Sequence, residues 1–381
     1  MNSRPIPPRP VALLGATGTV GQRFCAMLAD HPWFRLERLF ASSRSAGKSY
    51  GEAVRWLDST PCPEHLRAIA VEEATPSAMG KLAEQGISVV FSALDAAAAK
   101  ELELACAAGG ANVFSNASSH RMNPHVPLVV PEVNGDHLAL MQSQNWRHAD
   151  ATGQPSSGSI VTNPNCSTIG LTLALAPLRQ AFGLRRVQLV SLQALSGAGL
   201  VDGEPLRLEN NIVPFISGEE EKLASESRKI LGTLVEDESP HIEQADLVVS
   251  ATCTRVPVVD GHTLCVSVEL EQPATAQELK NCWVNFKASP QELNLPSAPQ
   301  PLVHVLEDTD APQPALQRDL GKGMAISVGR LRPEALYGES DLANSSARRS
   351  WKFVTLSHNL IRGAAGGSLL NAELALATDR I

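Results

Sequence analysis

One short segment near the start of the chain constrains the fold more than any other: the apolar run and glycine-rich turn VALLGATGTVG of residues 11–21. The apolar run is typical of a buried strand, and the residues up to 30 have the spacing of an amphipathic helix. A glycine-rich turn between strand and helix lets backbone amides approach a pyrophosphate at the helix N-terminus. The alternative is an ordinary tight turn. The predicted cofactor contacts are Gly15, Thr17, Gly18, Thr19, Val20 and Gly21.

The segments that follow alternate between strand-like and helical patterns. An Ala-rich helix is expected at 95–109, between apolar strand-like runs. This alternation predicts an α/β Rossmann-type domain with a mostly parallel, doubly wound sheet. The strand-like runs are LERLFAS (36–42), ISVVFSAL (87–94), ANVFSNAS (111–118) and PLVVPEVN (127–134).

Beyond about residue 184 the pattern changes to long β-like runs separated by turns. They predict an α+β domain with a mixed, largely antiparallel sheet, with helices near 219–231 and 276–287. The β-like runs are 185–195, 245–259 and 262–270. We expect a nucleotide domain over 1–164, a second domain over 165–358, and a returning helix over 359–381. The polar stretch 142–159 and the segment 288–322 are expected to be irregular.

Composition excludes several classes of protein. A formal charge of −8 gives no support for a nucleic-acid or membrane-surface partner. No apolar run approaches the roughly 20 residues that span a bilayer, and no secretory signal is evident. The seven cysteines are widely spaced without CxxC pairs, which favours reduced thiols in the cytoplasm over disulfides or zinc. No ligand cluster requires a metal.

The end of the second strand distinguishes between the two nicotinamide cofactors. NAD enzymes usually carry an acidic residue there, which binds the ribose hydroxyls. Residues 41–48 are ASSRSAGK and contain no acid. Ser42, Ser43 and Arg44 suit a 2′-phosphate, so NADP is predicted; Lys48 could equally lie in a solvated loop.

Cys166 follows a polar turn and precedes a run of helical spacing. It therefore lies at a predicted helix N-terminus, where unpaired N–H groups and the macrodipole favour a thiolate. A thiolate there is a nucleophile. The alternative is a small buried residue at a helix start. Two other cysteines, Cys253 and Cys265, alternate with apolar residues and are expected in the core of a sheet.

Further motifs occur in a distinctive order: SNASSHRM, VPLVVPEVN, NPNCSTIG, SLQALSGAG, SGEEEKL and RVPVVDGHT. Together with GATGTVG, they resemble the fungal/archaeal-type branch of the aspartate-semialdehyde dehydrogenase family over residues 11–377. The resemblance implies that L-aspartyl-4-phosphate is reduced with NADPH to aspartate 4-semialdehyde and phosphate, on the route to lysine, threonine and methionine. It also implies a homodimer or homotetramer, with residues 165–358 as the catalytic and dimerisation domain.

The same resemblance implies roles for individual residues. Cys166 matches the nucleophile that forms a thioester, and His262, beside an expected tight turn at Asp260-Gly261, matches the acid/base. Gln193 matches an orienting hydrogen-bond donor. Asn165 is a further polar candidate beside the nucleophile.

Another set of side chains is expected to bind the substrate and the cofactor. Arg255 matches the residue that grips the α-carboxylate, a role that suits a planar guanidinium. Glu219 matches the acid at the substrate amino group. Phosphate contacts are implied for Arg121 and Lys222, with Asn116 nearby, and cofactor contacts for Ser92 and Asn359. For Arg255, and for the Glu219/Lys222 pair on one helix face, the alternative is a surface ion pair.

Three other interpretations remain open. Two are reductases on the same scaffold, acting on N-acetyl-glutamyl-phosphate or malonyl-CoA. A phosphate clamp argues against the CoA thioester, and an amino-binding Glu219 argues against an N-acylated substrate. The third is an idle NADP-binding homologue, against which the joint presence of Cys166, Gln193, Arg255 and His262 counts.

Overall fold

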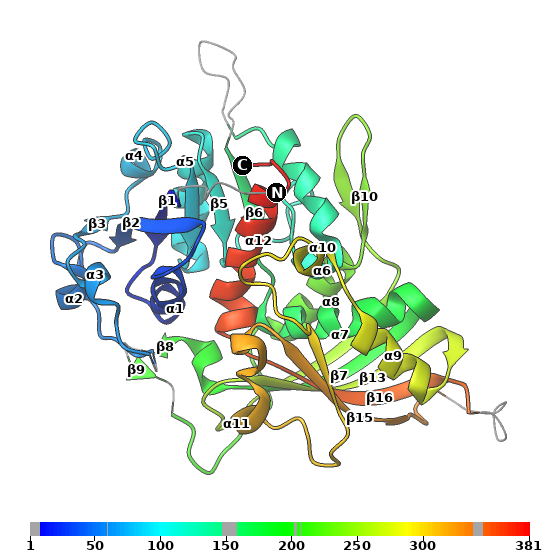
Figure 1. The fold of residues 1–381 in the computed structure, drawn as a ribbon. Helices are drawn as coiled ribbons and strands as arrows, with labels where there is room; N and C mark the ends of the chain where they lie inside the picture. The colour runs from blue at the N-terminus through cyan, green and yellow to red at the C-terminus, as the bar shows by residue number, and fades with distance from the viewer. Residues whose placement is uncertain (1–7, 59, 147–157, 202–203, 206, 338–345) are drawn as a thin grey trace.

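The structure is a computed structural model that describes residues 8–58, 60–146, 158–201, 204–205, 207–337 and 346–381. Two six-stranded sheets, each covered by helices, make up the molecule (Figure 1). The first sheet is wholly parallel, in the order β3-β2-β1-β4-β5-β6. This is the doubly wound order of dinucleotide-binding domains. Its strands are β1 (Arg9–Leu14), β2 (Phe34–Ala41), β3 (Val71–Glu73), β4 (Val89–Ser92), β5 (Asn112–Ser115) and β6 (Ser159–Thr162).

Both faces of this sheet are buried, which explains the continuous apolar runs of its strands. Alternate residues of β1 point to opposite faces. Val11 and Leu13 pack toward α1 (Thr19–Leu28) and α12 (Gly366–Ala377). Ala12 and Leu14 point the other way and pack toward α4 (Pro76–Met79) and α5 (Ala96–Ala108). Helix α12 thus brings the end of the chain back to the first sheet (Figure 1).

The second sheet is mixed, in the order β12-β7-β13-β16-β15-β14. The β12–β7 and β14–β15 pairs are parallel, and the other pairs are antiparallel. The expected fold class, with its mixed and largely antiparallel second sheet, is confirmed. The strands are β7 (Leu184–Gln193), β12 (Val248–Arg255), β13 (His262–Ala274), β14 (Val303–Leu306), β15 (Ile326–Pro333) and β16 (Arg348–Ser357).

One face of this sheet carries α7 (Cys166–Phe182), α8 (Glu219–Ile230) and α9 (Ala276–Asn285) (Figure 1). The remaining short elements join these layers. They are α2 (Tyr50–Ala53), α3 (Glu64–Arg67), α6 (Pro131–Asn134), η1 (Gly135–Ser143), η2 (Leu195–Ala198), β8 (Leu200–Val201), β9 (Glu204–Pro205), β10 (Thr233–Val235), β11 (His241–Glu243), α10 (Ser289–Glu292), α11 (Pro314–Gln317), η3 (Leu320–Gly323) and the π-helical turn η4 (Ile361–Ala365).

Two expectations about secondary structure are wrong. Residues 127–134 do not form a strand: Leu128 makes a single bridge to Thr162, and Pro131 starts the one-turn helix α6. Proline suits the first turn of a helix, and its missing N–H cannot serve a ladder. The segment 288–322 is not wholly irregular either, because it contains β14, α10 and α11. The polar stretch 142–159 lies mostly outside the described residues.

The turn at Asp260-Gly261 does not form a hairpin. β12 and β13 are both hydrogen-bonded to β7, which lies between them. The connection therefore crosses the end of β7, and Gly261 adopts a φ of 101° that favours glycine there. As a result Arg255, Gln193 and His262 lie at the same end of three adjacent strands.

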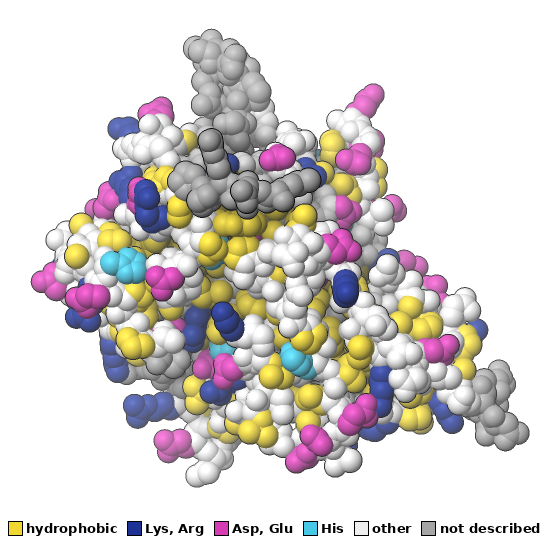
Figure 2. All heavy atoms as spheres, in the orientation of Figure 1, with side chains coloured by type: hydrophobic (Ala, Val, Ile, Leu, Met, Phe, Trp, Pro, Cys, Tyr) yellow, Lys and Arg dark blue, Asp and Glu magenta, His cyan; other side chains and the backbone are white. Residues whose placement is uncertain are grey.

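The two cysteines expected in the core of this sheet differ in their burial. Cys253 is fully buried, whereas Cys265 is exposed on the face of the sheet opposite the helices. Val190 and Val248 are exposed to 37% and 60% on neighbouring strands. On the side of the molecule in Figure 2, basic and acidic side chains are interspersed. In the part of the chain that the structure describes, no helix is long and apolar enough to cross a membrane.

Candidate active site

Cys166 is the first residue of α7, as the sequence predicts. The helix begins there because Asn165 caps it, its side chain accepting the N–H of Ser167 at 2.9 Å. The Sγ atom of Cys166 lies 3.1 Å from Nε2 of His262. The candidate nucleophile and its expected proton partner are therefore in contact, although 96 residues separate them.

His262 is fully buried at the start of β13. Its Nδ1 accepts the backbone N–H of Ala194 at 3.0 Å. A ring nitrogen that accepts a hydrogen bond carries no proton, so the neutral imidazole has its proton on Nε2. That proton points toward the sulfur of Cys166.

Burial disfavours a charge on either member of the Cys166–His262 pair. Burial raises the pKa of the Cys166 thiol, and the nearby Glu219 carboxylate raises it further. Burial lowers the pKa of His262, and the Arg255 guanidinium adds to this effect. Desolvation thus acts against the helix N-terminus and favours the thiol form of Cys166 over the expected thiolate.

Glu219 forms the acidic centre of the site. Its Oε2 accepts from Asn165 Nδ2 at 2.7 Å and from Gln193 Nε2 at 3.3 Å, and its Oε1 accepts from Lys222 Nζ at 2.9 Å. Glu219 and Gln193 are buried, whereas the side chain of Lys222 is 37% exposed. The Glu219/Lys222 pair is therefore half-buried beside the nucleophile turn and not a freely solvated surface pair.

Arg255 lies on the same side as His262. It is buried, and its Nη1 donates to the carbonyl of Ala194 at 2.7 Å. A Cβ at Gly197 would lie 2.8 Å from this Nη1 and 3.1 Å from His262 Nε2. Glycine at 197 thus leaves room for both side chains in the turn that follows β7.

Arg121 and Asn116 come from the loop after β5. Arg121 donates from Nη2 to the carbonyl of Asn116 at 2.7 Å and from Nη1 to Glu226 at 3.0 Å. Asn116 accepts on Oδ1 from Asn163 Nδ2 at 3.0 Å. The sequence interpretation missed Glu226, which shares one face of α8 with Glu219; their seven-residue spacing was the available signal.

The π-helical turn η4 closes the site from the returning end of the chain. A Cβ at Gly363 would lie 2.7 Å from the Cβ of Cys166. Just before this turn, Asn359 accepts the N–H of Gly261 at 2.9 Å and donates to Ser196 Oγ at 2.9 Å. Asn359, an expected cofactor contact, therefore braces the turn that carries His262.

The glycine-rich turn fits a bound pyrophosphate. Gly15 has a φ of 76°, and a Cβ there would lie 2.6 Å from the carbonyl oxygen of Ala93. A Cβ at Gly21 would lie 2.2 Å from the oxygen of Gly15. No side chain caps α1 at Gly18, and Thr19 Oγ1 is buried without a partner among the described residues. These open donors suit an anion at the helix N-terminus.

Other predicted cofactor contacts lie in α1 or at the ends of β2 and β4. Val20 follows Thr19 in α1. Ser42, Ser43 and Arg44 are exposed in the loop after β2, and Ser92 is buried at the end of β4.

Two further residues hold the turn and were not predicted. Tyr50 donates to the oxygen of Ala16 at 3.0 Å, and Gln22 donates to that of Thr17 at 3.0 Å. Gln22 could have been noticed as a polar residue in the helix that follows the turn.

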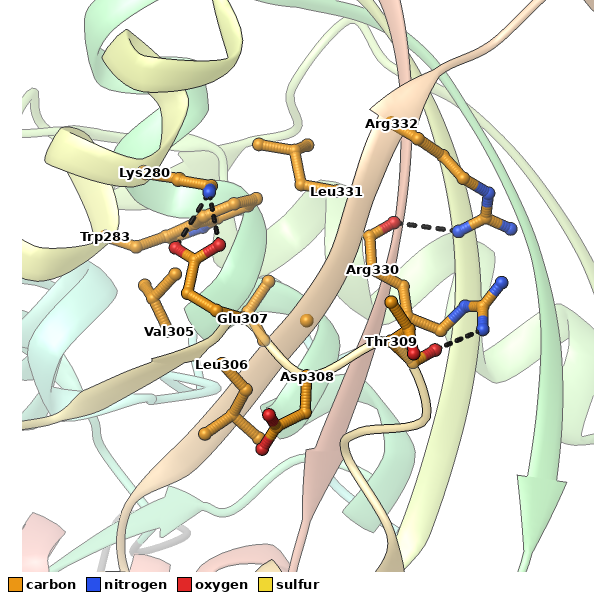
Figure 3. Close-up of a pocket in the computed structure, with 12 residues that line it drawn as sticks. Lys280, Trp283, Val305, Leu306, Glu307, Asp308, Thr309, Arg330, Leu331 and Arg332 are labelled. Carbon is orange, nitrogen blue, oxygen red and sulfur yellow. Dashed lines mark hydrogen bonds and ion pairs between the residues drawn. The ribbon is translucent and has the colours of Figure 1, made fainter.

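A separate pocket of about 250 Å³ lies between α9 and the β14–β15 pair (Figure 3). Trp283 lines it, and Lys280 donates to both carboxylate oxygens of Glu307 across it. It contains none of the predicted site residues. Among the described residues, no group of three His, Cys, Asp or Glu side chains could hold a metal ion.

Comparisons with known proteins agree with this arrangement. Residues 10–141 match the family model described as semialdehyde dehydrogenase, NAD binding domain, and residues 175–362 match its dimerisation domain. The chain is 44% identical to the aspartate-semialdehyde dehydrogenase of Archaeoglobus fulgidus, with 96% of this chain and 97% of that one covered. It is 45% identical to that of Methanothermobacter thermautotrophicus, with 96% and 98% covered.

Among solved structures, the chain is similar to the aspartate semialdehyde dehydrogenase of Candida albicans, crystallised with NADP. The TM-score is 0.84 at 39% identity, and 98% of this chain and 100% of that one are covered. The resemblance drawn from the motifs is thus confirmed over nearly the whole length. This chain belongs to the aspartate-semialdehyde dehydrogenase family.

Proposed function

We propose that this protein reduces L-aspartyl-4-phosphate with NADPH to L-aspartate 4-semialdehyde and phosphate. The observation that carries the proposal is the contact of 3.1 Å between Cys166 Sγ and His262 Nε2, in a site that also holds a buried carboxylate and a buried guanidinium. The substrate has a cationic amino group, an anionic carboxylate and an anionic acyl phosphate. The amino group is matched by Glu219, and the carboxylate by Arg255. The acyl phosphate is matched by Arg121 together with Lys222.

The first chemical step forms a thioester on Cys166. Sγ attacks the acyl carbon, the carbon–oxygen bond to phosphate breaks, and the thiol proton leaves with the departing phosphate as HPO₄²⁻. This balance does not require His262 to take the thiol proton. It also suits a thiol with a raised pKa, because the departing phosphate takes the proton as the sulfur attacks.

The Ala194 hydrogen bond alters the part expected of His262. To accept a proton on Nε2, the neutral ring would need its other proton on Nδ1, where it would face the N–H of Ala194. We therefore assign His262 the role of a hydrogen-bond donor from Nε2. It stabilises negative charge on the sulfur and on the oxygen of the thiohemiacetal, and Gln193 assists in orienting the reacting carbonyl.

NADP is the proposed cofactor, and when bound in its reduced form it supplies the hydride for the thioester. Gly15 and Gly21 let the turn pack closely against Ala93 and against its own backbone. At Gly18 no side chain caps the N-terminus of α1, and Thr19 Oγ1 is available as a donor for the pyrophosphate. Ser42, Ser43 and Arg44 would hold the 2′-phosphate, since no acid stands at this strand end. Ser92 and Asn359 are proposed to lie beside the nicotinamide end.

We also propose that the chain works as a homodimer or homotetramer in the cytoplasm. The uncovered face of the second sheet, which carries Val190, Val248 and Cys265, is the proposed contact surface. All seven cysteines are unpaired, which suits a reducing compartment. Sedimentation would show a monomer if this face had no partner. For its organisation we propose a nucleotide domain over 1–164, a catalytic domain over 165–358 and a return segment over 359–381.

One assay separates the candidate reactions. NADPH formation is followed with aspartate semialdehyde, phosphate and NADP, and then with N-acetylglutamate semialdehyde in place of the first substrate. We expect turnover with the first substrate and loss of at least about 1000-fold in Cys166→Ala. Activity on the second substrate alone, or on neither, would overturn the proposal, and full turnover of Cys166→Ala would refute the covalent mechanism.

A further inference from the structure

Glu226 lies on α8 outside the groups that the proposed reaction uses, yet it is hydrogen-bonded to one of them, Arg121, and to Asn165, the residue before Cys166. We infer that Glu226 is a positioning residue: it orients Arg121 for phosphate and holds the turn that carries Cys166. The identity of the ligand as phosphate rests on the proposed function, whereas the contacts of the Glu226 carboxylate are independent of it.

Both oxygens of Glu226 are engaged. Oε1 accepts from Arg121 Nη1 at 3.0 Å, and Oε2 accepts the backbone N–H of Asn165 at 2.6 Å. The residue is 2% exposed. A buried carboxylate is tolerated only where donors satisfy it, and each donor in turn depends on its acceptor. One side chain of the second domain thus ties together the Arg121 loop and the residue that precedes the nucleophile.

Arg121 keeps donors free for a ligand while two bonds hold its plane. Its Nη1 and Nη2 bond to Glu226 and to the carbonyl of Asn116. Its Nε is buried and has no hydrogen-bond partner within the described part of the chain. A guanidinium held on one side in this way presents its remaining N–H groups in a fixed direction, as recognition of a phosphate requires.

Lys229, one turn further along α8, fixes the backbone of the same loop. Its Nζ donates to the carbonyl oxygens of Arg121, Asn123 and Val126, each at 2.7 Å. The ammonium is buried and lies close enough to Glu226 for their charges to interact. Helix α8 therefore holds Arg121 both by its side chain and by its main chain.

The test compares Glu226→Gln with a matched variant. A carboxamide keeps the shape but has only one acceptor oxygen, so its NH₂ would face either Arg121 Nη1 or the N–H of Asn165. We expect the affinity for inorganic phosphate, from ³¹P line broadening with the full chain, to fall about 10- to 100-fold. The phosphate KM should rise equally while the NADP KM stays within about twofold. Glu373→Gln, which removes a buried carboxylate bonded to His31 and Ser297, should leave both unchanged.

A double-mutant cycle distinguishes positioning from a general loss of structure. In an Arg121→Gln background, Glu226→Gln should lower phosphate affinity by less than about twofold more, because it acts through Arg121. If Glu226→Gln does not fold, Glu226→Asp serves instead, since it keeps the charge but is too short to reach both donors. Additive losses, full affinity in Glu226→Asp, or a KM rise shared by NADP would overturn the inference.

Phosphate binding is measured without turnover, so the inference and the proposed reaction fail separately. Loss of phosphate binding in Glu226→Gln, with no turnover of aspartate semialdehyde by the unmodified protein, would refute only the reaction. Turnover with unchanged phosphate affinity in Glu226→Gln would refute only the positioning role.

Discussion

Replacing Gly363 by alanine tests whether the returning end of the chain sets the position of the nucleophile. The new Cβ would lie 2.7 Å from Cys166 Cβ and 3.0 Å from Cys166 Cα. Ordinary contacts begin at 3.4 Å, so η4 and the start of α7 must separate by at least the difference of about 0.7 Å. Overpacking of this kind costs roughly 1–3 kcal/mol of the free energy of unfolding.

The effect on catalysis should exceed the effect on stability. A misplacement near 1 Å lowers turnover by up to about 100-fold, so we expect kcat/KM for aspartate semialdehyde to fall about 10- to 100-fold. Alkylation of Cys166 by iodoacetamide should change as well, because the contact between Cys166 and His262 is disturbed. Gly80→Ala is the matched control, since its Cβ would lie 3.5 Å from the nearest atom, the Pro76 oxygen. Activity within about threefold of the unmodified protein, with unchanged alkylation, would refute the reasoning.

Four other outcomes are expected. Arg44→Glu should raise the KM for NADPH about 10- to 100-fold and that for NADH less than about twofold; equal changes would contradict a 2′-phosphate contact. Because burial raises the pKa of the Cys166 thiol, alkylation should increase about tenfold per pH unit from pH 7 to about 9.5, without a plateau near 8.5. ¹⁵N shifts should identify His262 Nδ1 as unprotonated and Nε2 as protonated, and the reverse would refute the donor role. Burial raises the pKa of Glu103 from 4.5 to about 7, so the folded wild type loses stability as pH rises through that window. The loss should be on the order of 3 kcal/mol in the free energy of unfolding, measured with urea at pH 4.5 and 8, and Glu103→Gln should not show it.

Much of the fold was predictable because it depends on local patterns. The strand, turn and helix at 11–30 need a glycine at position 15, where φ is 76°, and another at position 21, where the backbone passes close to the oxygen of Gly15. The motif has glycine at both positions. The segment 127–134 was mispredicted because it pairs with β6 through a single bridge, and its apolar residues are divided between two cores. Val129 packs in the core of the first sheet, whereas Leu128 and Val130 pack in that of the second. β14 was missed because four residues at an edge carry a weak periodic signal.

The candidate site divides in the same way. The position of Cys166 at a helix start follows from Asn165 and the run behind it, which are neighbours in sequence. The raised pKa of its thiol does not, because desolvation depends on the segments packed around Cys166, including Gly363 from nearly 200 residues away. Glu226 was overlooked for a similar reason: its partners come from other elements, and only packing reveals that both of its oxygens are used.

Residue type and spacing are enough to predict the type of fold, the glycine-rich turn, the acid-free strand end and the side chains proposed to react. These follow from residue type and short-range spacing, which act through local conformation. Long-range packing sets which nitrogen of His262 faces the sulfur, how far burial raises the pKa of the Cys166 thiol, and how Arg121 is held. Those properties depend on hydrogen bonds and desolvation between segments far apart in the chain, and no local pattern encodes such distances.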